Sequence, residues 1–439
     1  MNKSPKIFQL VIAGIFVVLL IFGFLAFSGK LDSILPASGG NINYGQVTLW
    51  GTLPQQKMQS LITEKLKANK SISINYVQKR ESSFNTDFVE ALARGQGPDL
   101  IILSQDDVLK KLDKLRVIPY QSLPQRDFKN TYVEEGEMFL RSDGVVAMPI
   151  VVDPLVMYWN RDIFTSALIP APPSLWSDFY NLVPKITIRD KDRNITRSLV
   201  SFGEYSNVSH AKEIVSMLMM QAGSPIVFDR NGELAAGLLS TSGANIENSV
   251  ITAMRFFTEF SKPEKDSYSW NRSLPMSLSM FQAGDLAIYL GYASEYEIIK
   301  EKNPHLNFDV TMIPQVSRTS TKLTYGRMQG VAIVAASKNQ TGAFYAASLL
   351  SGDNFSSGLS AMLGLPPARR NLIASRPSDA ALAVFYDSAL IARGWYDPSP
   401  SDTNALFMEM FDSVTSGRSS MAEALRVANN NLTRLLRSQ

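Results

Sequence analysis

The chain has 439 residues, too many for one compact core, so two lobes of ordinary domain size are expected. Hydrophobic residues make up 45% and charged residues 19%, a balance typical of a folded body, and the net charge of +3 provides no basic excess for binding nucleic acid. The absence of cysteine excludes disulfides, thiolate chemistry and a lipidated cysteine, and two histidines argue against a histidine-rich metal site.

The N-terminus carries a long apolar segment. Residues 7–27 are apolar apart from Gln9, and Lys3 and Lys6 precede them. About 20 residues of α-helix span the hydrocarbon core of a bilayer, so the segment is long enough to cross it. We therefore expect a single-pass anchor in the cell membrane at residues 1–28. Its lysines place a short N-terminus in the cytoplasm and the rest of the chain outside.

This N-terminal segment has one alternative interpretation. A signal peptide cleaved after Ser28 would also be apolar, although the apolar region of such peptides has only about 7–15 residues. Residues 29–46 contain several glycines and asparagines and a proline, which predicts a flexible stalk. With either interpretation, we expect the body from residue 47 onward to be extracytoplasmic.

Strands and helices alternate in the first part of the body. The pattern consists of an apolar run at 47–50, helical spacing at 58–66, strict alternation at 72–77, helical spacing at 84–92 and a continuous apolar run at 100–103. A continuous apolar run is typical of a parallel strand buried on both faces. The order predicts a βαβαβ unit and therefore a doubly wound α/β lobe.

A second α/β region begins near Asp153. Strands are expected at 186–188, 227–228 and 286–290, and a helix is expected at about 246–260. The sequence from Asp229 to Gly232 predicts a tight turn, because Asn-Gly tolerates positive φ. The chain from about residue 403 onward is expected to be helical, with an apolar stripe formed by Ala424, Val427, Leu432 and Leu435.

Several short segments have the order and spacing of a known family. They are VTLWG at 47–51, GPDLI at 97–101, VAMPIVVDPLVMYWN at 146–160, WSDF at 176–179, FQAGDLAI at 281–288, MIP at 312–314, GVAI at 330–333 and GLPPA at 364–368. Together they resemble the extracellular solute-binding proteins of the maltose-binding type, which serve carbohydrate ABC importers. The resemblance covers about residues 46–438.

The resemblance implies an α/β fold of the periplasmic-binding-protein type, with two lobes and a ligand cleft between them, preceded by the transmembrane helix. Lobe one would comprise residues 47–152 and 315–378, and lobe two residues 153–314 and 379–439. The implied function is to bind a mono- or oligosaccharide, without a cofactor, and to deliver it by lobe closure to the permease subunits of an ABC transporter. We expect a monomer.

Polar side chains and one tryptophan follow the predicted strands of lobe one. Trp50 ends the first strand, Glu81 and Ser82 follow the second, and Ser104 and Gln105 end the third. Parallel α/β folds bind ligands at the carboxyl ends of their strands, so these residues are candidate ligand contacts. Packing in the lobe core is the alternative for the tryptophan, and a solvated loop is the alternative for the glutamate.

Two further candidates stand out by their surroundings. Asp153 interrupts an apolar run, where a charge is costly unless a partner or a ligand satisfies it, and the family has a ligand-binding carboxylate at this crossing. The alternative is a hydrogen bond within the hinge. Trp270 lies in a polar loop, where an aromatic side chain has little core to fill, so we expect it in the wall of the cleft.

The remaining candidates are aromatic or polar residues at strand ends and before the last helices. They are Gly291 and Tyr292 after a strand, the polar cluster Tyr325, Arg327 and Gln329 before a strand, and Trp395 in the aromatic region that varies within the family. Carbohydrates favour such sites, because rings pack on their C–H surfaces and planar polar groups bind their hydroxyls. The alternative for Arg327 is a surface ion pair.

No catalytic or metal site is expected. The sequence has no phosphate-binding P-loop, no Gly-x-Ser-x-Gly elbow and no His-Glu-x-x-His helix, so the ATPase of an importer would be a separate polypeptide. Asp190, Asp192 and Asn194 imitate the start of a calcium loop, but Ile195 and Ser201 occupy the positions of its glycine and glutamate.

Two other functions stay open. One is a receptor of the same fold that does not transport its ligand but presents it to a sensor or binds surface glycan, as a permanent anchor would permit. The other is an exported hydrolase with Asp153 and Glu81 as paired carboxylates.

Overall fold

The computed structural model describes residues 43–230, 232–239 and 246–438. The transmembrane helix predicted at residues 1–28 and most of the predicted stalk lie outside these ranges. Within them, no helix has both the length and the apolar character needed to cross a membrane.

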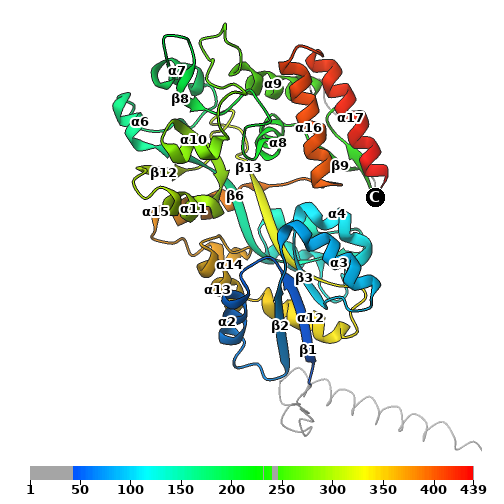
Figure 1. The fold of residues 1–439 in the computed structure, drawn as a ribbon. Helices are drawn as coiled ribbons and strands as arrows, with labels where there is room; N and C mark the ends of the chain where they lie inside the picture. The colour runs from blue at the N-terminus through cyan, green and yellow to red at the C-terminus, as the bar shows by residue number, and fades with distance from the viewer. Residues whose placement is uncertain (1–42, 231, 240–245, 439) are drawn as a thin grey trace, which may run out of the picture.

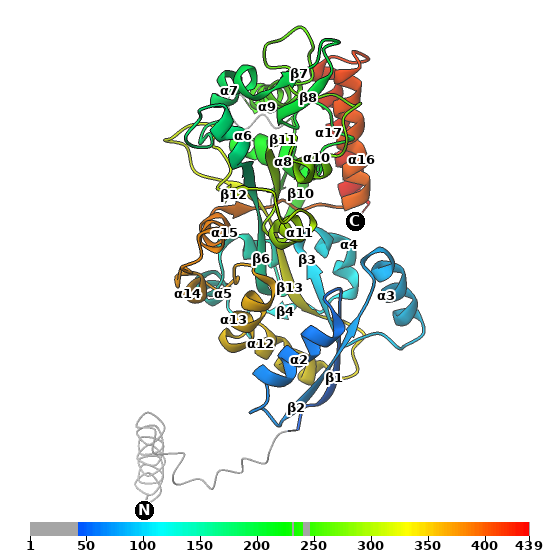
Figure 2. The same ribbon diagram turned by 60° about the vertical axis from the view of Figure 1, so that its left-hand side comes forward.

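One large mixed sheet runs through the molecule. Its ten strands follow the order β2-β1-β3-β13-β6-β11-β8-β7, with β12 beside β6 and β14 beside β13. The long strands β6 (Met148–Asn160) and β13 (Thr324–Ile333) are antiparallel neighbours at its centre. Both strands run from one lobe into the other, and the remaining elements gather into two bodies above and below (Figures 1 and 2).

The body at the bottom of Figure 1, lobe one, is built around three parallel strands. Its elements are β1 (Gly45–Gly51), α2 (Gln55–Lys65), β2 (Ile72–Gln78), η2 (Glu81–Ser83), α3 (Phe84–Ala93), β3 (Leu100–Ser104), η3 (Gln105–Asp107), α4 (Val108–Lys111), η4 (Leu112–Lys114), β4 (Ile118–Pro119), α5 (Gln125–Thr131), η5 (Glu134–Phe139), β5 (Gly144–Val145), α12 (Gln340–Leu350), α13 (Asp353–Leu363) and α14 (Arg370–Ile373). The predicted βαβαβ unit is confirmed.

The apolar pattern of lobe one explains its packing. Met58, Leu61 and Ile62 share one face of α2 and are buried, while β2 alternates, with Ile74 and Tyr76 inside. The strand β3 is buried at its first four positions, as a central parallel strand must be, because helices cover both faces of the sheet.

The upper body, lobe two, contains the remaining elements. They are α6 (Arg161–Ser166), α7 (Asp178–Ile186), β7 (Ile188–Arg189), β8 (Ile195–Val200), α8 (Ala211–Gln221), β9 (Val227–Arg230), β10 (Glu233–Ala236), α9 (Ile246–Glu259), α10 (Ser277–Ala283), β11 (Leu286–Tyr292), η6 (Ala293–Glu295), α11 (Tyr296–Lys302), β12 (Phe308–Thr311), α15 (Ala380–Leu390), β14 (Ala392–Arg393), α16 (Pro400–Thr415) and α17 (Met421–Arg437). Of these, α15 and β14 lie where the lobes meet.

Most predicted elements of lobe two are confirmed, with two corrections. Gly284 ends α10 in the left-handed conformation at φ 90°, which explains the glycine of the FQAGDLAI segment. Ile186 ends a helix rather than starting a strand, because its side chain completes the buried face of α7. Val427 is 43% exposed, so the apolar stripe of α17 is narrower than predicted and rests on Ala424, Leu425, Ala428 and Leu432.

Buried hydrophobic residues form two separate cores that meet at the central strands. On β6, Val152 belongs to the core of lobe one and Leu155 to that of lobe two. On β13, Met328 belongs to lobe one and Tyr325 to lobe two. Both strands therefore change lobes within a few residues of each other. The exact residue bounds of the two lobes remain a prediction from the sequence.

Candidate functional site

A pocket opens where the parallel strands of lobe one end. The strand β1 pairs in parallel with β2 and with β3, so the carboxyl ends of all three strands meet at one edge of the sheet. There the chain encloses a cavity of about 200 Å³, which we call the strand-end pocket. It is lined by Thr52, Glu81, Phe84, Asn85, Ile102, Leu103, Ser104, Asp107, Arg327 and Gln329.

An ion pair between the two connecting strands borders this pocket. Arg327 on β13 lies directly opposite Asp153 on β6, and its Nη2 donates to Asp153 Oδ2 over 3.2 Å. The backbone N–H of Ser294 donates to the other carboxylate oxygen over 3.0 Å. Burial raises the pKa of the Asp153 carboxyl, although Arg327 and Ser294 oppose that rise.

The guanidinium of Arg327 is held from several sides. It lies over the ring of Tyr292, with 4.3 Å between the guanidinium carbon and the ring centroid. Burial lowers the pKa of Arg327, but Tyr292 and the carboxylates of Asp153 and Asp106 outweigh this effect and raise it overall. The arginine therefore stays charged.

Two buried polar atoms of the strand-end pocket lack a partner. Nε of Arg327 and Oε1 of Gln329 have no hydrogen-bond partner within the described ranges. The first is a donor and the second an acceptor, and leaving such groups unpaired costs about 1–3 kcal/mol each. Two residues that line the pocket thus carry one donor and one acceptor that the protein itself does not use.

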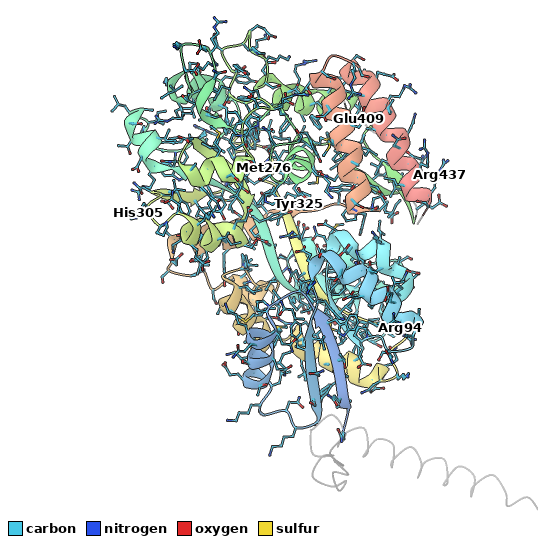
Figure 3. The ribbon with its side chains drawn as sticks, in the orientation of Figure 1. Arg94, Met276, His305, Tyr325, Glu409 and Arg437 are labelled. Carbon is cyan, nitrogen blue, oxygen red and sulfur yellow. The ribbon has the colours of Figure 1, made fainter. Side chains whose placement is uncertain are left out.

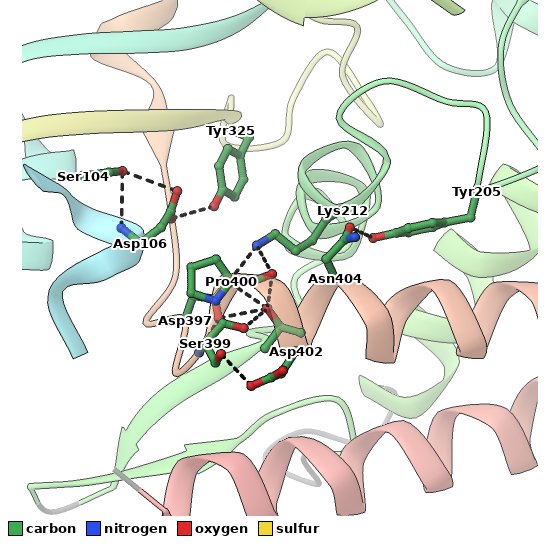
Figure 4. A network of polar contacts seen from close by, with 11 residues as sticks. Ser104, Asp106, Tyr205, Lys212, Tyr325, Asp397, Ser399, Pro400, Asp402 and Asn404 are labelled. Carbon is green, nitrogen blue, oxygen red and sulfur yellow. Dashed lines mark hydrogen bonds and ion pairs between the residues drawn. The ribbon is translucent and has the colours of Figure 1, made fainter. Parts of the chain in front are cut away.

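Lobe two presents a second buried ion pair to the cleft. Nζ of Lys212 lies 2.8 Å from Oδ2 of Asp397, and both side chains are almost fully buried (Figure 4). The hydroxyl of Thr403 donates to both oxygens of Asp397 over 2.9 Å, and the backbone N–H of Ser399 donates to one of them over 3.0 Å. These bonds fix the carboxylate, and with it the lysine.

Asp106 brings lobe one to this ion pair. Tyr325, which lies between the lobes in Figure 3, donates its hydroxyl to Asp106 Oδ1 over 3.2 Å. Burial, together with Asp397 and Glu213, raises the pKa of Asp106 to about 6, while Lys212 and Arg327 oppose the rise. Charged groups of both lobes therefore act on one carboxyl group in the cleft.

The structure brings together part of the predicted site. Glu81, Ser104 and Arg327 line the strand-end pocket, as does Gln329 of the predicted polar cluster. Asp153 and Tyr292 contact Arg327, and Tyr325 contacts Asp106. Ser82 lies beside Glu81 in η2 with its residue exposed, and it does not line the pocket.

The prediction for Trp270 is wrong. Its side chain is fully buried in the core of lobe two, where Nε1 donates to Oδ1 of Asn207 over 2.9 Å. The polar loop folds onto the end of α9, because the backbone N–H groups of Ser269 and Trp270 both donate to the carbonyl of Phe260. The indole therefore fills the core rather than the wall of the cleft.

Three other candidates are used within the fold. Gln105 is 2% exposed, and its amide bonds the backbone of β13, donating to Gly326 O and accepting from Met328 N. Gly291 has no free space beside it, because a Cβ there would lie 2.3 Å from the Glu295 carboxylate. Trp395 is 3% exposed and belongs to the core of lobe two.

Trp50 precedes Thr52 of the pocket lining by two residues but is covered. It is the last residue of β1 before Gly51, at 8% exposure within the core of lobe one, and the Nζ of Lys79 lies 3.8 Å from the centroid of its ring. The ring therefore shows a ligand neither a free face nor an open edge.

Sequence reasoning missed several residues of the site. Thr52, Phe84, Asn85 and Asp107 line the pocket and lie two or three positions beyond the residues singled out after the strand ends. Lys212 was missed as well, although a lysine at the start of the apolar helix α8 is a signal that it needs a buried partner.

A larger cavity lies away from the strand ends. It measures about 450 Å³ and lies between residues 172–175 and 311–322 of lobe two. Unlike those of the strand-end pocket, the described residues that line it include no buried polar side-chain atom without a partner. The strand-end pocket, whose lining residues carry two such atoms, is therefore the better candidate. Among the described residues, no group of three or more acidic, histidine or cysteine side chains is suited to a metal ion.

Comparisons with known proteins agree with this architecture. Residues 51–350 match the family of bacterial extracellular solute-binding proteins, and the chain belongs to this family. It is therefore a binding protein rather than an enzyme, and its body is extracytoplasmic. No curated protein sequence matches the chain.

Solved structures share the fold at low sequence identity. The cyclic α-maltosyl-1,6-maltose binding protein from Arthrobacter globiformis is 14% identical, with a TM-score of 0.74 over 90% of this chain and 99% of that one. The sugar-binding protein MalE from Xanthomonas citri is 16% identical, with a TM-score of 0.72 over 90% and 98%. An ABC transporter solute-binding protein from Thermotoga lettingae, bound with α-D-tagatose, is 18% identical, with a TM-score of 0.64 over 89% and 100%.

Proposed function

We propose that this protein captures a carbohydrate in the cleft at the strand-end pocket and delivers it to the permease of an ABC importer. The observation that carries the proposal is the pair of unused groups in one pocket, the Arg327 Nε donor and the Gln329 Oε1 acceptor. A hydroxyl group both donates and accepts, so neighbouring hydroxyls of one sugar satisfy both groups. The sugar-binding proteins whose solved structures share the fold support this ligand class.

Delivery requires that the ligand changes the arrangement of the lobes. The strands β6 and β13 change lobes side by side, which is the position of a hinge. A ligand held by lobe one at Arg327 and by lobe two near Lys212 stabilises the closed arrangement, because only that arrangement brings both sets of groups to it. A permease can then distinguish the loaded protein from the empty one.

The N-terminal apolar segment supports a membrane-tethered form. We propose that residues 1–28 remain as a single-pass anchor, with the body held outside the membrane as a monomer on the stalk. Membrane fractionation and mass spectrometry of the mature N-terminus test this. Retention of residue 1 in the membrane fraction supports the anchor, and a mature chain that begins at residue 29 contradicts it.

Binding and closure have separate readouts. Isothermal titration calorimetry and thermal unfolding across a panel of sugars measure binding, and small-angle scattering with and without a bound sugar measures closure. We expect at least one sugar to bind, to raise the unfolding temperature and to reduce the radius of gyration. If no sugar binds, the carbohydrate assignment is wrong. If a sugar binds while the scattering curve stays the same, the delivery step is wrong.

A further inference from the structure

The aromatic rings beside the cleft are covered by the protein's own cations. Nζ of Lys79 lies 3.8 Å from the centroid of Trp50, and Nζ of Lys111 lies 5.9 Å from that of Phe84. We call such cations ring caps. They matter because the apolar C–H face of a sugar packs on an aromatic face only when that face is open.

Two more ring caps lie where the lobes meet. The guanidinium carbon of Arg327 is 4.3 Å from the centroid of Tyr292, and that of Arg141 is 4.5 Å from the centroid of Tyr396. His210 packs edge-on against Tyr292 as well, with 4.8 Å between the ring centroids. A cation therefore lies over each of these four rings, where a sugar ring would otherwise pack.

Acidic groups hold three of these cations in place. Lys79 lies 3.5 Å from a carboxylate oxygen of Asp87, and Lys111 lies 2.9 Å from one of Asp107. Arg327 is bound to Asp153, as described above. A ligand that displaced a ring cap would have to break an ion pair as well as a cation–π contact, so the ring caps are fixed features of the empty protein.

The four tryptophans other than Trp50 are far from the pocket or buried. Trp176 and Trp270 are in the core of lobe two, and Trp395 is 3% exposed there. Trp159 is half-buried but lies six residues beyond Asp153 on β6, which is roughly 20 Å along an extended strand. None of the five tryptophans of the chain therefore offers an open platform at the pocket.

The size and charge of the strand-end pocket also limit the ligand that it can hold. At about 200 Å³ it is smaller than the ~300–1,000 Å³ typical of sites for drug-sized ligands. Its lining includes the carboxyl groups of Glu81 and Asp107 and one base, Arg327, whose charge Asp153 balances. Lys111 balances Asp107, so an anionic ligand would meet the Glu81 carboxyl without a free cation among the lining residues to compensate it.

We infer that the ligand is a single uncharged sugar ring, held by hydrogen bonds to Arg327 and Gln329, rather than a chain of stacked rings. This inference rests on the proposed function and narrows it. One ring has enough hydroxyls for the unused donor and acceptor, and it needs no open aromatic face beyond the pocket. An oligosaccharide would place its further rings against the ring caps.

Calorimetry with the full-length chain, in a detergent without a sugar headgroup, tests the inference. The probes are single-ring sugars (D-glucose, D-galactose, D-mannose, D-xylose and D-tagatose), the longer maltose and maltotetraose, and the charged rings glucuronate and glucosamine. We expect one of the uncharged single rings to bind at least about 10-fold more tightly than any longer or charged probe, as one additional or missing hydrogen bond would produce.

The possible outcomes separate this inference from the proposed function. Tighter binding of maltotetraose than of every single ring overturns the inference and leaves carbohydrate binding intact. Tighter binding of a charged ring overturns the statement that the ligand is uncharged. If no sugar of any length binds, the proposed function fails, and the inference fails with it.

Variants of the pocket connect the result to the named residues. Gln329→Met keeps the side-chain length but removes the acceptor, and we expect it to weaken binding of the single ring by about 10-fold. Gln125→Met, at the exposed start of α5, is the matched control and leaves the affinity unchanged. Thermal unfolding of both variants shows whether they fold. A folded Gln329→Met protein with unchanged affinity contradicts the assignment.

Discussion

Arg327 and Asp153 lie in register on β13 and β6, the two strands that connect the lobes, and their side chains form an ion pair 3.2 Å long. Asp153 is nearly buried, whereas the side chain of Arg327 is 35% exposed. Arg327 thus belongs to the lining of the strand-end pocket, and Asp153 belongs to the hinge. The geometry of the pair connects ligand contact to the position where the lobes turn.

Removing the carboxylate tests the structural part of this role. Asp153→Ala leaves a guanidinium without its partner, and we expect the free energy of unfolding to fall by about 2 kcal/mol. That is less than the ~3–5 kcal/mol of a fully buried pair, because water reaches the exposed part of Arg327. Urea unfolding measures the change. Asp113 is an exposed carboxylate of lobe one. If Asp153→Ala loses no more unfolding free energy than Asp113→Ala, Asp153 does not stabilise the fold through its ion pair.

The raised pKa of Asp106 predicts a dependence of stability on pH. The folded carboxyl has a pKa of about 6 and the unfolded one about 4, so between these values the folded state binds more protons. The contribution of Asp106 to stability is therefore largest below pH 4 and decreases as the pH rises towards 6. Asp106→Asn removes this dependence.

We expect the stability of Asp106→Asn, relative to the unchanged protein, to be about 2 kcal/mol more favourable at pH 7.5 than at pH 4.5. Urea unfolding at the two pH values checks this. The matched control is Asp113→Asn, because Asp113 is exposed on the surface of lobe one and is paired with Lys114. If Asp106→Asn changes the free energy of unfolding by the same amount at both pH values, the Asp106 carboxyl titrates normally.

The buried ion pair of lobe two gives a third prediction. Lys212→Met leaves Asp397 nearly buried without its cation, although Thr403 and Ser399 still donate to it. We expect a loss of about 3 kcal/mol at pH 7.5. The loss should be smaller at pH 5, because burial already raises the pKa of Asp397 and the lost cation raises it further, so that the carboxyl takes up a proton.

Urea unfolding of Lys212→Met at both pH values measures this difference. The double variant Lys212→Met with Asp397→Leu removes both charges, and we expect it to be more stable than the single variant at pH 7.5. A single variant that loses the same stability at both pH values would mean that Asp397 does not become protonated.

The sequence could predict the local elements but not the ion pairs. The βαβαβ unit of lobe one follows from apolar patterns within runs of a few residues, such as the buried strand Leu100–Ser104. The contacts of the site join residues far apart in the chain: 174 residues separate Asp153 from Arg327, and 185 separate Lys212 from Asp397. No local pattern specifies which charge meets which.

Trp270 shows the same limit for aromatic residues. Its polar neighbours indicated an exposed loop, but two backbone hydrogen bonds to Phe260 turn the loop inward and bury the ring. We expect Trp270→Phe to cost about 1–2 kcal/mol of stability, because Asn207 loses its donor, and to leave ligand affinity unchanged. Calorimetry with the bound sugar and urea unfolding separate the two effects. A lower affinity at unchanged stability would restore the cleft role of Trp270.

The ring cap on Trp50 is open to a direct test. Lys79→Ala removes the ammonium that lies over the indole, and we expect the ring to become accessible to water, because at 8% exposure only this side chain and the lobe core cover it. Tryptophan fluorescence should shift to longer wavelength and be quenched more strongly by acrylamide. The loss of stability should stay at about 0.5–1 kcal/mol, as for a cation–π contact near the surface.

Lys79→Ala also shows whether Lys79 keeps ligands away from Trp50 or only stabilises the fold. An open indole face beside the strand-end pocket should raise the affinity for maltotetraose more than that for a single sugar ring, because only the longer ligand reaches Trp50 with a second ring. Lys79→Arg keeps a cation over the ring and is the matched control. In a Trp50→Phe background the fluorescence change on Lys79→Ala should vanish. If it persists there, the signal comes from another tryptophan, and Lys79 does not shield Trp50.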